Sequence, residues 1–117
     1  MHPPFGNVTT GRSANFSVSA NQWTDIVTKT FTPDEYGIYI VFAYGEAWYG
    51  STTLKQFYLL GAKGTIMAQG DCVTFGTCLC GIAEIGPSNP TIKLRCHPGS
   101  AAATVANTSN ITWIKIA

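Results

Sequence analysis

The sequence predicts an all-β fold, a single antiparallel sandwich or barrel, and three observations support this. The apolar segments are rich in Thr, Val, Ile and aromatic residues, and 12 glycines and 6 prolines separate them. Turn signals recur at about the 8–12-residue spacing of sandwiches and barrels. Every apolar segment long enough for an amphipathic helix is interrupted by glycine or proline before the pattern is complete.

The length and the charge limit what such a fold can be. The 117 residues suffice for one core, and we expect residues 1–12 to be loosely structured and residues 13–117 to form one head domain. Charged residues make up only 11% of the chain, against about 25% in soluble domains. The net charge is +1 without a basic stripe, so a nucleic-acid partner is not expected. A surface this poor in charge indicates that part of it is covered by another protein surface.

The N-terminal half contains two strands, a turn and a long apolar strand. Phe16–Ala20 alternates apolar residues with serine, as a half-exposed strand does, and Trp23–Thr32 is a strand rich in β-branched residues. Pro33–Gly37 is typical of a turn, because proline fixes φ and aspartate and glycine tolerate turn geometry. A strand then runs to about Trp48.

That strand contains YGIYIVFAYG (Tyr36–Gly45), which is apolar on both faces. Side chains alternate between the faces of a strand, so Tyr39 and Val41 lie opposite the set that begins at Ile38 and Ile40. Crossover helices that could cover a second face are not predicted. We therefore expect other copies of the chain to cover the face with Tyr39 and Val41. Alternatively, a loop of the same chain covers it.

The C-terminal half continues with short strands. Eight to ten strands are expected in total, and those after Trp48 are Leu54–Gly61 and Gly64–Gly70 as a hairpin, one long or two short strands in Cys72–Ile85, Thr91–His97, a short strand within Pro98–Asn110, and Ile111–Ala117.

Four cysteines, Cys72, Cys78, Cys80 and Cys96, would permit two disulfides. Cys78 and Cys80 share a face of one strand, and we do not expect a signal peptide from the N-terminal residues, so we expect free and mostly buried thiols. Their spacing, with His97 next to Cys96, does not match the C-x₂₋₄-C knuckles of zinc sites. Neither a metal nor a cofactor is expected.

The segment KTFTPDEYGIYIVFAYGEAW (Lys29–Trp48) resembles a strand of tumour-necrosis-factor-like and complement-type globular heads, in which a turn ending in glycine precedes a Gly-aliphatic-Tyr-aliphatic run. SNITWIKIA (Ser109–Ala117) is similar to their last strand. The resemblance implies a jelly roll whose inner sheet packs around a threefold axis. It extends to the heads at the tips of bacteriophage tail fibres and receptor-binding proteins. It implies a homotrimer, with Trp113 at the interface beside Tyr39 and Val41.

Binding is a more plausible role than catalysis. In GEAWYGSTT (Gly45–Thr53), Trp48 and Tyr49 are flat aromatic residues among short polar ones, which suits a sugar or a protein epitope. Equally, Trp48 could fill the end of the core. The sequence contains no recognisable catalytic motif. A hydrolase that uses His97 with Asp71 or Glu84 is the least favoured alternative.

We therefore expect a non-enzymatic trimeric head that attaches a phage fibre or receptor-binding protein to a host-cell receptor, either glycan or protein. The expected location is the virion, or otherwise the extracellular space. One alternative is a structural trimerisation or capping module, and another is a secreted signalling ligand of the complement or necrosis-factor type. Membrane insertion is not expected, because the longest apolar run is far shorter than the roughly 20 residues of a spanning helix.

Overall fold

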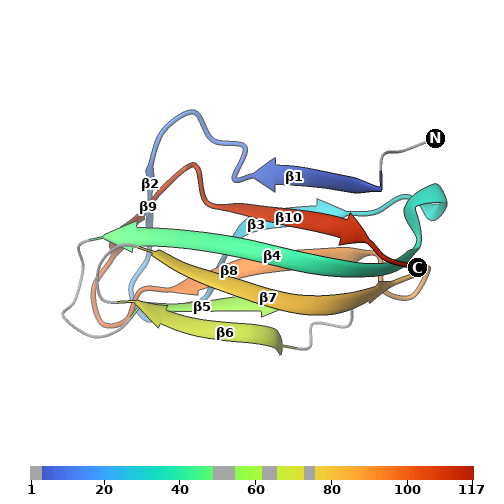
Figure 1. Cartoon of the computed structure of the whole chain (residues 1–117). Helices are drawn as coiled ribbons and strands as arrows, with labels where there is room; N and C mark the ends of the chain where they lie inside the picture. Colours follow the sequence, from blue (N-terminus) through green and yellow to red (C-terminus); the bar gives the residue numbers. More distant parts are fainter. Residues whose placement is uncertain (1–3, 49–54, 62–65, 73–75) are drawn as a thin grey trace.

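Two antiparallel β-sheets pack face to face in the computed structural model, which describes residues 4–48, 55–61, 66–72 and 76–117 (Figure 1). The predicted all-β sandwich is confirmed. The first sheet contains β1 (Phe5–Thr9), β2 (Phe16–Val18), β4 (Gly37–Trp48), β7 (Gly76–Ile85), β9 (Ala103–Val105) and β10 (Asn110–Lys115). The second contains β3 (Thr24–Thr30), β5 (Lys55–Leu60), β6 (Ile66–Cys72) and β8 (Thr91–His97).

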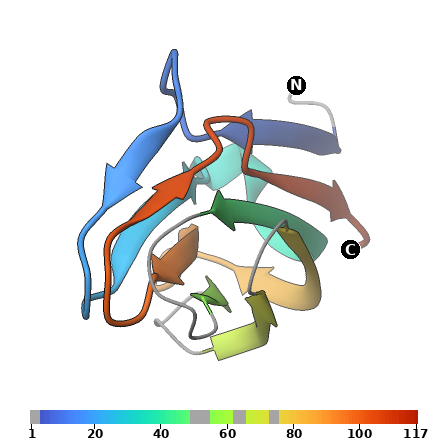
Figure 2. The same cartoon turned by 90° about the vertical axis from the view of Figure 1, so that its left-hand side faces the viewer.

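The apolar strand of the sequence, β4, is the centre of the first sheet. β7 pairs along one edge of β4, from Gly37 to Glu46. On its other edge, β10 pairs with residues 39–44 and β9 with Ala47 and Trp48, and β1 lies outside β10. Seen from the end of the sandwich, β1, β10 and β4 of this sheet lie above β5 and β6 of the second sheet (Figure 2). The long strand thus holds the first sheet together.

The second sheet has the order β3-β8-β5-β6. The predicted hairpin is confirmed, since β5 and β6 pair antiparallel. The register between β3 and β8 shifts after Asp25, where Thr24 and Asp25 pair with Cys96 and Arg95. This irregularity lets the consecutive residues Ile26 and Val27 both be buried in the core.

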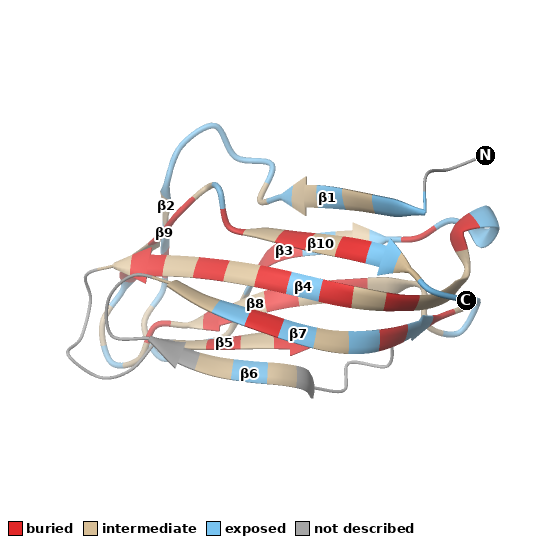
Figure 3. Cartoon of the chain, viewed as in Figure 1, coloured by how far each residue is buried: buried red, intermediate tan, exposed pale blue. Residues whose placement is uncertain are grey.

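The core lies between the sheets, and β4 shows how it is made: its residues alternate between buried and more exposed along the whole strand (Figure 3). Gly45 is one of the inward positions. A Cβ there would lie 2.3 Å from Cδ1 of Phe57 on β5, so only glycine leaves room for this ring. The two sheets therefore lie in close contact at Gly45.

A polar network closes one end of the sandwich. Glu35, in a short 3₁₀ helix (Pro33–Glu35), accepts hydrogen bonds from the Thr32 backbone N–H at 2.9 Å and from its hydroxyl at 2.9 Å. The Lys29 ammonium lies 3.3 Å from the carboxylate and over the rings of Phe31 and Trp113. Burial raises the pKa of Glu35, but the bonds from Thr32 and Lys29 outweigh it, and the net pKa is lowered. The buried carboxylate is thus held in its charged form.

The N-terminal prediction is wrong in part. Residues 5–9, expected to be loose, form β1 and pair with β10 over five residues. Gly6 lies directly against the Trp113 ring, where a Cβ would come within 2.4 Å of Cζ2. A glycine at a core-facing position breaks the apolar alternation by which the strand would have been recognised.

Candidate functional site

The structure corrects the predicted interface residues. Tyr39, Val41 and Trp113 face the second sheet and are buried inside their own chain, and Val41 is 0% exposed. They cannot form a subunit interface. Both faces of β4 are apolar. The alternation of side chains along the strand therefore assigns its residues to two faces but does not show which face points into the core. The small residues Ala43 and Ala47, on the same face as Val41, mark the side against which the other sheet packs.

The outward face of β4 is the one that lacks a cover. Ile40 is paired with Ile82 of β7 on one side and Ile114 of β10 on the other, and Ile114 is paired with Phe5 of β1. Directly paired residues project from the same face, so four large apolar side chains form one row across four strands. Phe5 is 64% and Ile82 62% exposed. Such a contiguous exposed row is unusual for a protein that stays monomeric.

The next row continues the apolar surface on one half of the sheet. Phe42, 43% exposed, is paired with Cys80 of β7. On the other half the row is polar, and the Asn7 amide donates to the Thr112 hydroxyl at 2.8 Å. We call the apolar side chains and cysteines of this outward surface the outer apolar face; it consists of Phe5, Ile40, Phe42, Cys78, Cys80, Ile82 and Ile114. Glu84 of β7 projects on the same side and borders it.

Two cysteines belong to this face. Cys78 and Cys80 are exposed free thiols, so the prediction of free thiols is confirmed for them and the prediction of burial is wrong. They are two residues apart on a strand, which places their Cα atoms about 6.7 Å apart, near the upper limit for a disulfide. Cys96 is buried in the core as expected. The side chain of Cys72 lies outside the described residues.

The predicted binding residues lie at the end of β4. Trp48 is half-buried and has the same strand parity as Phe42, so it points to the outer side of the first sheet and does not fill the core. Its Cα partner is Thr104 of β9. Tyr49 lies outside the described residues. A role for Trp48 in receptor binding stays a prediction.

His97 and Glu84, one of the two possible hydrolase pairs, are not brought together, because they lie on different sheets. His97 lies on the outer side of the second sheet, where its Nδ1 accepts a hydrogen bond from the Gly99 N–H at 3.1 Å and its ring meets Trp23. Glu84 is exposed on the outer side of the first sheet, and the side chain of Asp71 lies outside the described residues. Within the described residues, groups of three or more His, Cys, Asp or Glu that could hold a metal ion do not occur.

A second surface, on the outer side of the second sheet, was not predicted as a site. The Asp25 carboxylate lies between two cations of β8, 3.1 Å from Lys93 Nζ and 2.6 Å from Arg95 Nε. Burial raises the pKa of Asp25, but these two partners outweigh it and the net pKa is lowered. Beside them, the rings of Trp23 and Tyr58 stack with centroids 4.1 Å apart. We call these five residues with His97 the charged face.

The sequence did contain a signal for this surface. Lys93, Arg95 and His97 alternate with apolar residues, which places them on one face of β8. Their approach to Asp25 depends on the irregular register of β3, which the sequence pattern does not show.

Comparisons with known proteins give the fold. Neither a protein-family model nor a curated protein matches the sequence. Among solved structures, Eiger TNF from S. frugiperda is similar at a TM-score of 0.51 and 13% identity, over 97% of this chain and 92% of that one. The enzymatically active domain of tailspike protein 4 from bacteriophage CBA120 aligns with 92% of this chain and 19% of its own, at 13% identity. Its TM-score of 0.32 is too low to support an argument.

Helices with the length and apolar character to cross a bilayer are absent from the described part of the chain. The strand order, the two packed sheets and the likeness to Eiger TNF together give the architecture: the chain folds as a tumour-necrosis-factor-like jelly roll.

Proposed function

We propose that this chain is a non-enzymatic recognition head that assembles as a homotrimer through the outer apolar face and attaches a virion to a cell-surface receptor. The observation that carries the proposal is the row Phe5, Ile114, Ile40 and Ile82, which crosses four strands and is largely exposed in the single chain. The proposed position is a phage tail fibre or a similar appendage.

Sister copies are the occupants of this face. Burying one large aliphatic or aromatic side chain stabilises by about 1.5–3 kcal/mol, and each copy brings several of them. The central row of the face is apolar, as the centres of stable interfaces are, and the charged Glu84 lies at its border. The family resemblance implies packing of this sheet around a threefold axis, which gives each chain the same cover.

The exposed thiols support a covered face as well. Free thiols in oxidising surroundings form disulfides or oxidise further. Cys78 and Cys80 lie within the outer apolar face, so a subunit interface would shield them. Two unpaired thiols on one strand favour a chain that folds and assembles in a reducing cell interior, as a virion part does, over a secreted chain.

Recognition would use the end of the sandwich at which β4 stops. Trp48 is half-exposed there, and Tyr49 follows it in the sequence. Three copies would present three such ends in parallel, and this multivalency raises the overall affinity of a weak single site.

A secreted signalling ligand is the second candidate. The likeness to Eiger TNF favours it as much as a viral head, because the likeness concerns the fold alone. A structural trimerisation or capping module would share the assembly and lack the receptor. Binding of the purified head to candidate host cells, with Trp48→Ala beside it, separates the structural module from both recognition roles.

The assembly test uses a pair of variants. Ile82→Lys places a charge in the outer apolar face at a position 62% exposed, so the single chain should still fold. Ser17→Lys places the same charge on exposed β2 and is the matched control. Native mass spectrometry at micromolar concentration should give a trimer for the control and a monomer for Ile82→Lys. Equal masses for the two variants would contradict the proposed interface.

A further inference from the structure

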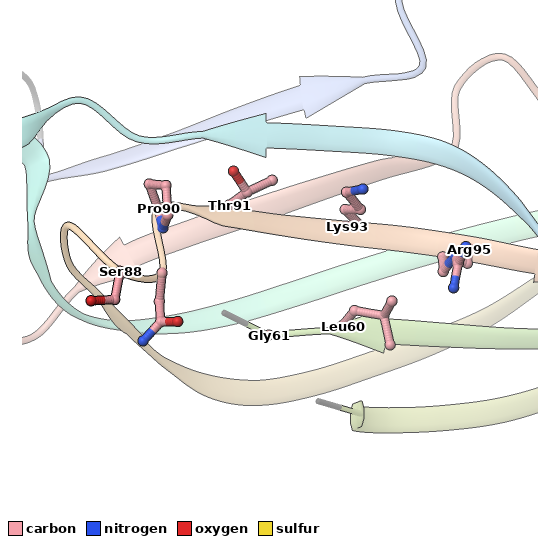
Figure 4. Close-up of a pocket in the computed structure, with 8 residues that line it drawn as sticks. Leu60, Gly61, Ser88, Pro90, Thr91, Lys93 and Arg95 are labelled. Carbon is pink, nitrogen blue, oxygen red and sulfur yellow. The ribbon is translucent and has the colours of Figure 1, made fainter. Parts of the chain in front are cut away.

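A second site lies on the other sheet. A cavity of about 320 Å³ opens between the end of β5 and the start of β8, beneath the turn that joins β7 to β8 (Figure 4). It is within the lower range of small-molecule sites. Its wall contains Leu60, Ser88, Asn89, Thr91, Lys93 and Arg95. It faces away from the outer apolar face, so the proposed trimer would leave it open.

The turn that forms the roof is held by its own backbone. Gly86 and Asn89 exchange two backbone hydrogen bonds, from the Asn89 N–H to the Gly86 carbonyl at 2.9 Å and back at 3.3 Å. β8 then runs along the cavity with Thr91, Lys93 and Arg95 on the same side of the strand. The donors of the site are therefore attached to a paired strand and a closed turn, which fixes their spacing before a ligand arrives.

The wall is rich in donors and carries positive charge. Lys93 and Arg95 contribute two cations, and the described residues of the lining include no acidic one. Asp25, beside the cavity, takes one contact from Lys93 and one from Nε of Arg95. Arginine has five N–H donors and lysine three, so most of this capacity remains for a ligand, and the local charge is +1. A carboxylate matches the planar fork of the guanidinium.

One hydrogen-bond acceptor among the cavity residues lacks a donor, and a ligand could supply it. Oδ1 of Asn89 is buried and has no hydrogen-bond partner among the described residues. Buried polar atoms are nearly always paired, and Asn89 itself lines the cavity. Its oxygen has almost no exposed surface, so a ligand hydroxyl would reach it after a rotation of the Asn89 side chain. The hydroxyls of Ser88 and Thr91 line the same cavity and can accept or donate.

We infer that this cavity binds an acidic saccharide, with the sugar carboxylate on Lys93 and Arg95 and a ring hydroxyl donating to Asn89. The size of the cavity suits one sugar ring, and Leu60 offers an apolar contact for its C–H face. Trp23 and Tyr58, stacked on the far side of Arg95, are in place for a neighbouring sugar. The inference names a receptor chemistry for the recognition head and depends on that role for its biological meaning.

The test compares two probes that differ only in the carboxylate. Methyl glucuronide and methyl glucoside are titrated into ¹⁵N-labelled protein at low salt, and chemical shifts are followed by NMR. We expect the glucuronide alone to bind, with shifts at the amides of Asn89 and of residues 91–95. Equal binding of both sugars, or shifts elsewhere, would overturn the inference.

Three variants locate the site. Arg95→Gln and Asn89→Ala should each weaken glucuronide binding, the former by about tenfold because a charge-assisted pair is lost. Asp25→Asn should strengthen binding, because it removes the carboxylate that competes for both cations. Arg12→Gln, which changes an arginine stacked on Phe16 instead, is the matched control and should bind as the parent does. A control as weak as Arg95→Gln would show non-specific attraction and overturn the site.

Two further ligands, acetate and a short acidic peptide, distinguish a saccharide site from a site for other acidic ligands. Acetate that binds as well as the glucuronide would reduce the site to a carboxylate pocket and contradict a saccharide. A short acidic peptide that binds while the glucuronide does not would assign the site to a protein ligand and overturn the inference. Oligomeric state is measured on the same samples. A monomer that binds the glucuronide refutes the proposed assembly alone, and a trimer that does not bind it refutes this inference alone.

Discussion

The two outer faces of the sandwich are built from similar strands and have opposite chemistry. On the first sheet, the central row from Phe5 to Ile82 is apolar on all four strands. On the second sheet, outward positions of β8 carry Lys93, Arg95 and His97, and Asp25 of β3 pairs with two of them. One fold thus presents one face that carries charge and one apolar face, which we propose is covered by other copies of the chain.

The difference shows where the low charge of the chain is concentrated. Only 11% of residues are charged, and the central row from Phe5 to Ile82 has no charged member, whereas ion pairs lie on the charged face and at the end of the sandwich. The fold itself does not require this, because exposed positions of either sheet tolerate polar residues. We propose that the asymmetry serves assembly and recognition, and the following experiments test this.

The largest loss of stability is expected for a substitution in the core at Val41, whose sequence neighbour Phe42 lies on the outer apolar face. Val41→Asp buries an unpaired charge at a position that is 0% exposed and should cost more than about 4 kcal/mol of unfolding free energy. Phe42→Asp changes the adjacent, 43% exposed residue and should leave the folded chain intact while it dissociates the assembly. Circular dichroism and sedimentation report the two properties. Similar losses of folding in both variants would refute the assignment of the faces.

The next effect tests the close approach of the two sheets. Gly45→Ala would place a Cβ 2.3 Å from Phe57 Cδ1 and should cost about 1–3 kcal/mol through overpacking. Gly86→Ala is the matched control, because a Cβ there meets nothing within 4 Å. Urea unfolding at one fixed protein concentration measures both. A harmless Gly45→Ala would mean that the sheets lie further apart than described.

The pH dependence tests the closed end of the sandwich. The pKa of Glu35 is lowered from its ordinary value of 4.5, so its charged form stabilises the fold above that pH and this contribution is lost as the pH falls through the folded-state pKa. Glu35→Gln should therefore be less stable than the parent by about 1 kcal/mol at pH 7. The gap should close below pH 4.5. A gap that stays constant with pH would contradict the described hydrogen bonds. The pKa of Asp25 is lowered as well, so the free energy of unfolding of both the parent and Glu35→Gln should also fall as the pH falls.

The smallest effect is expected on the charged face. Asp25→Ala removes two partly exposed ion pairs, which are each worth about 0–1 kcal/mol, so thermal unfolding should shift only slightly. Its oligomeric state should not change. If Asp25→Ala dissociated the assembly, the subunit contact would lie on the second sheet, which would contradict the proposed interface on the first sheet.

The sequence was sufficient for the class of fold and for most strands. Turn residues delimited Thr91–His97 almost perfectly, and the family resemblance in Lys29–Trp48 named the jelly roll that the structure shows. These successes depend on local signals, in which a glycine or proline ends a segment whose alternation is clear.

The site was harder to predict, because it depends on contacts between distant residues. The doubly apolar run around Tyr39 indicated an uncovered face, yet the choice between its two faces needs Phe57, which packs against Gly45 from the other sheet. The exposure of Cys80 follows from the same choice. The cavity at Asn89 arises where β5 ends near the turn before β8, and no local pattern encodes that meeting.

Assembly through the outer apolar face is the central claim, and the mass of the purified chain in solution tests it most directly. Sedimentation equilibrium of the unmodified protein at micromolar concentration, under reducing conditions, should give three times the mass of one chain. A single-chain mass under those conditions would contradict the account, because the row from Phe5 to Ile82 would then be exposed to water.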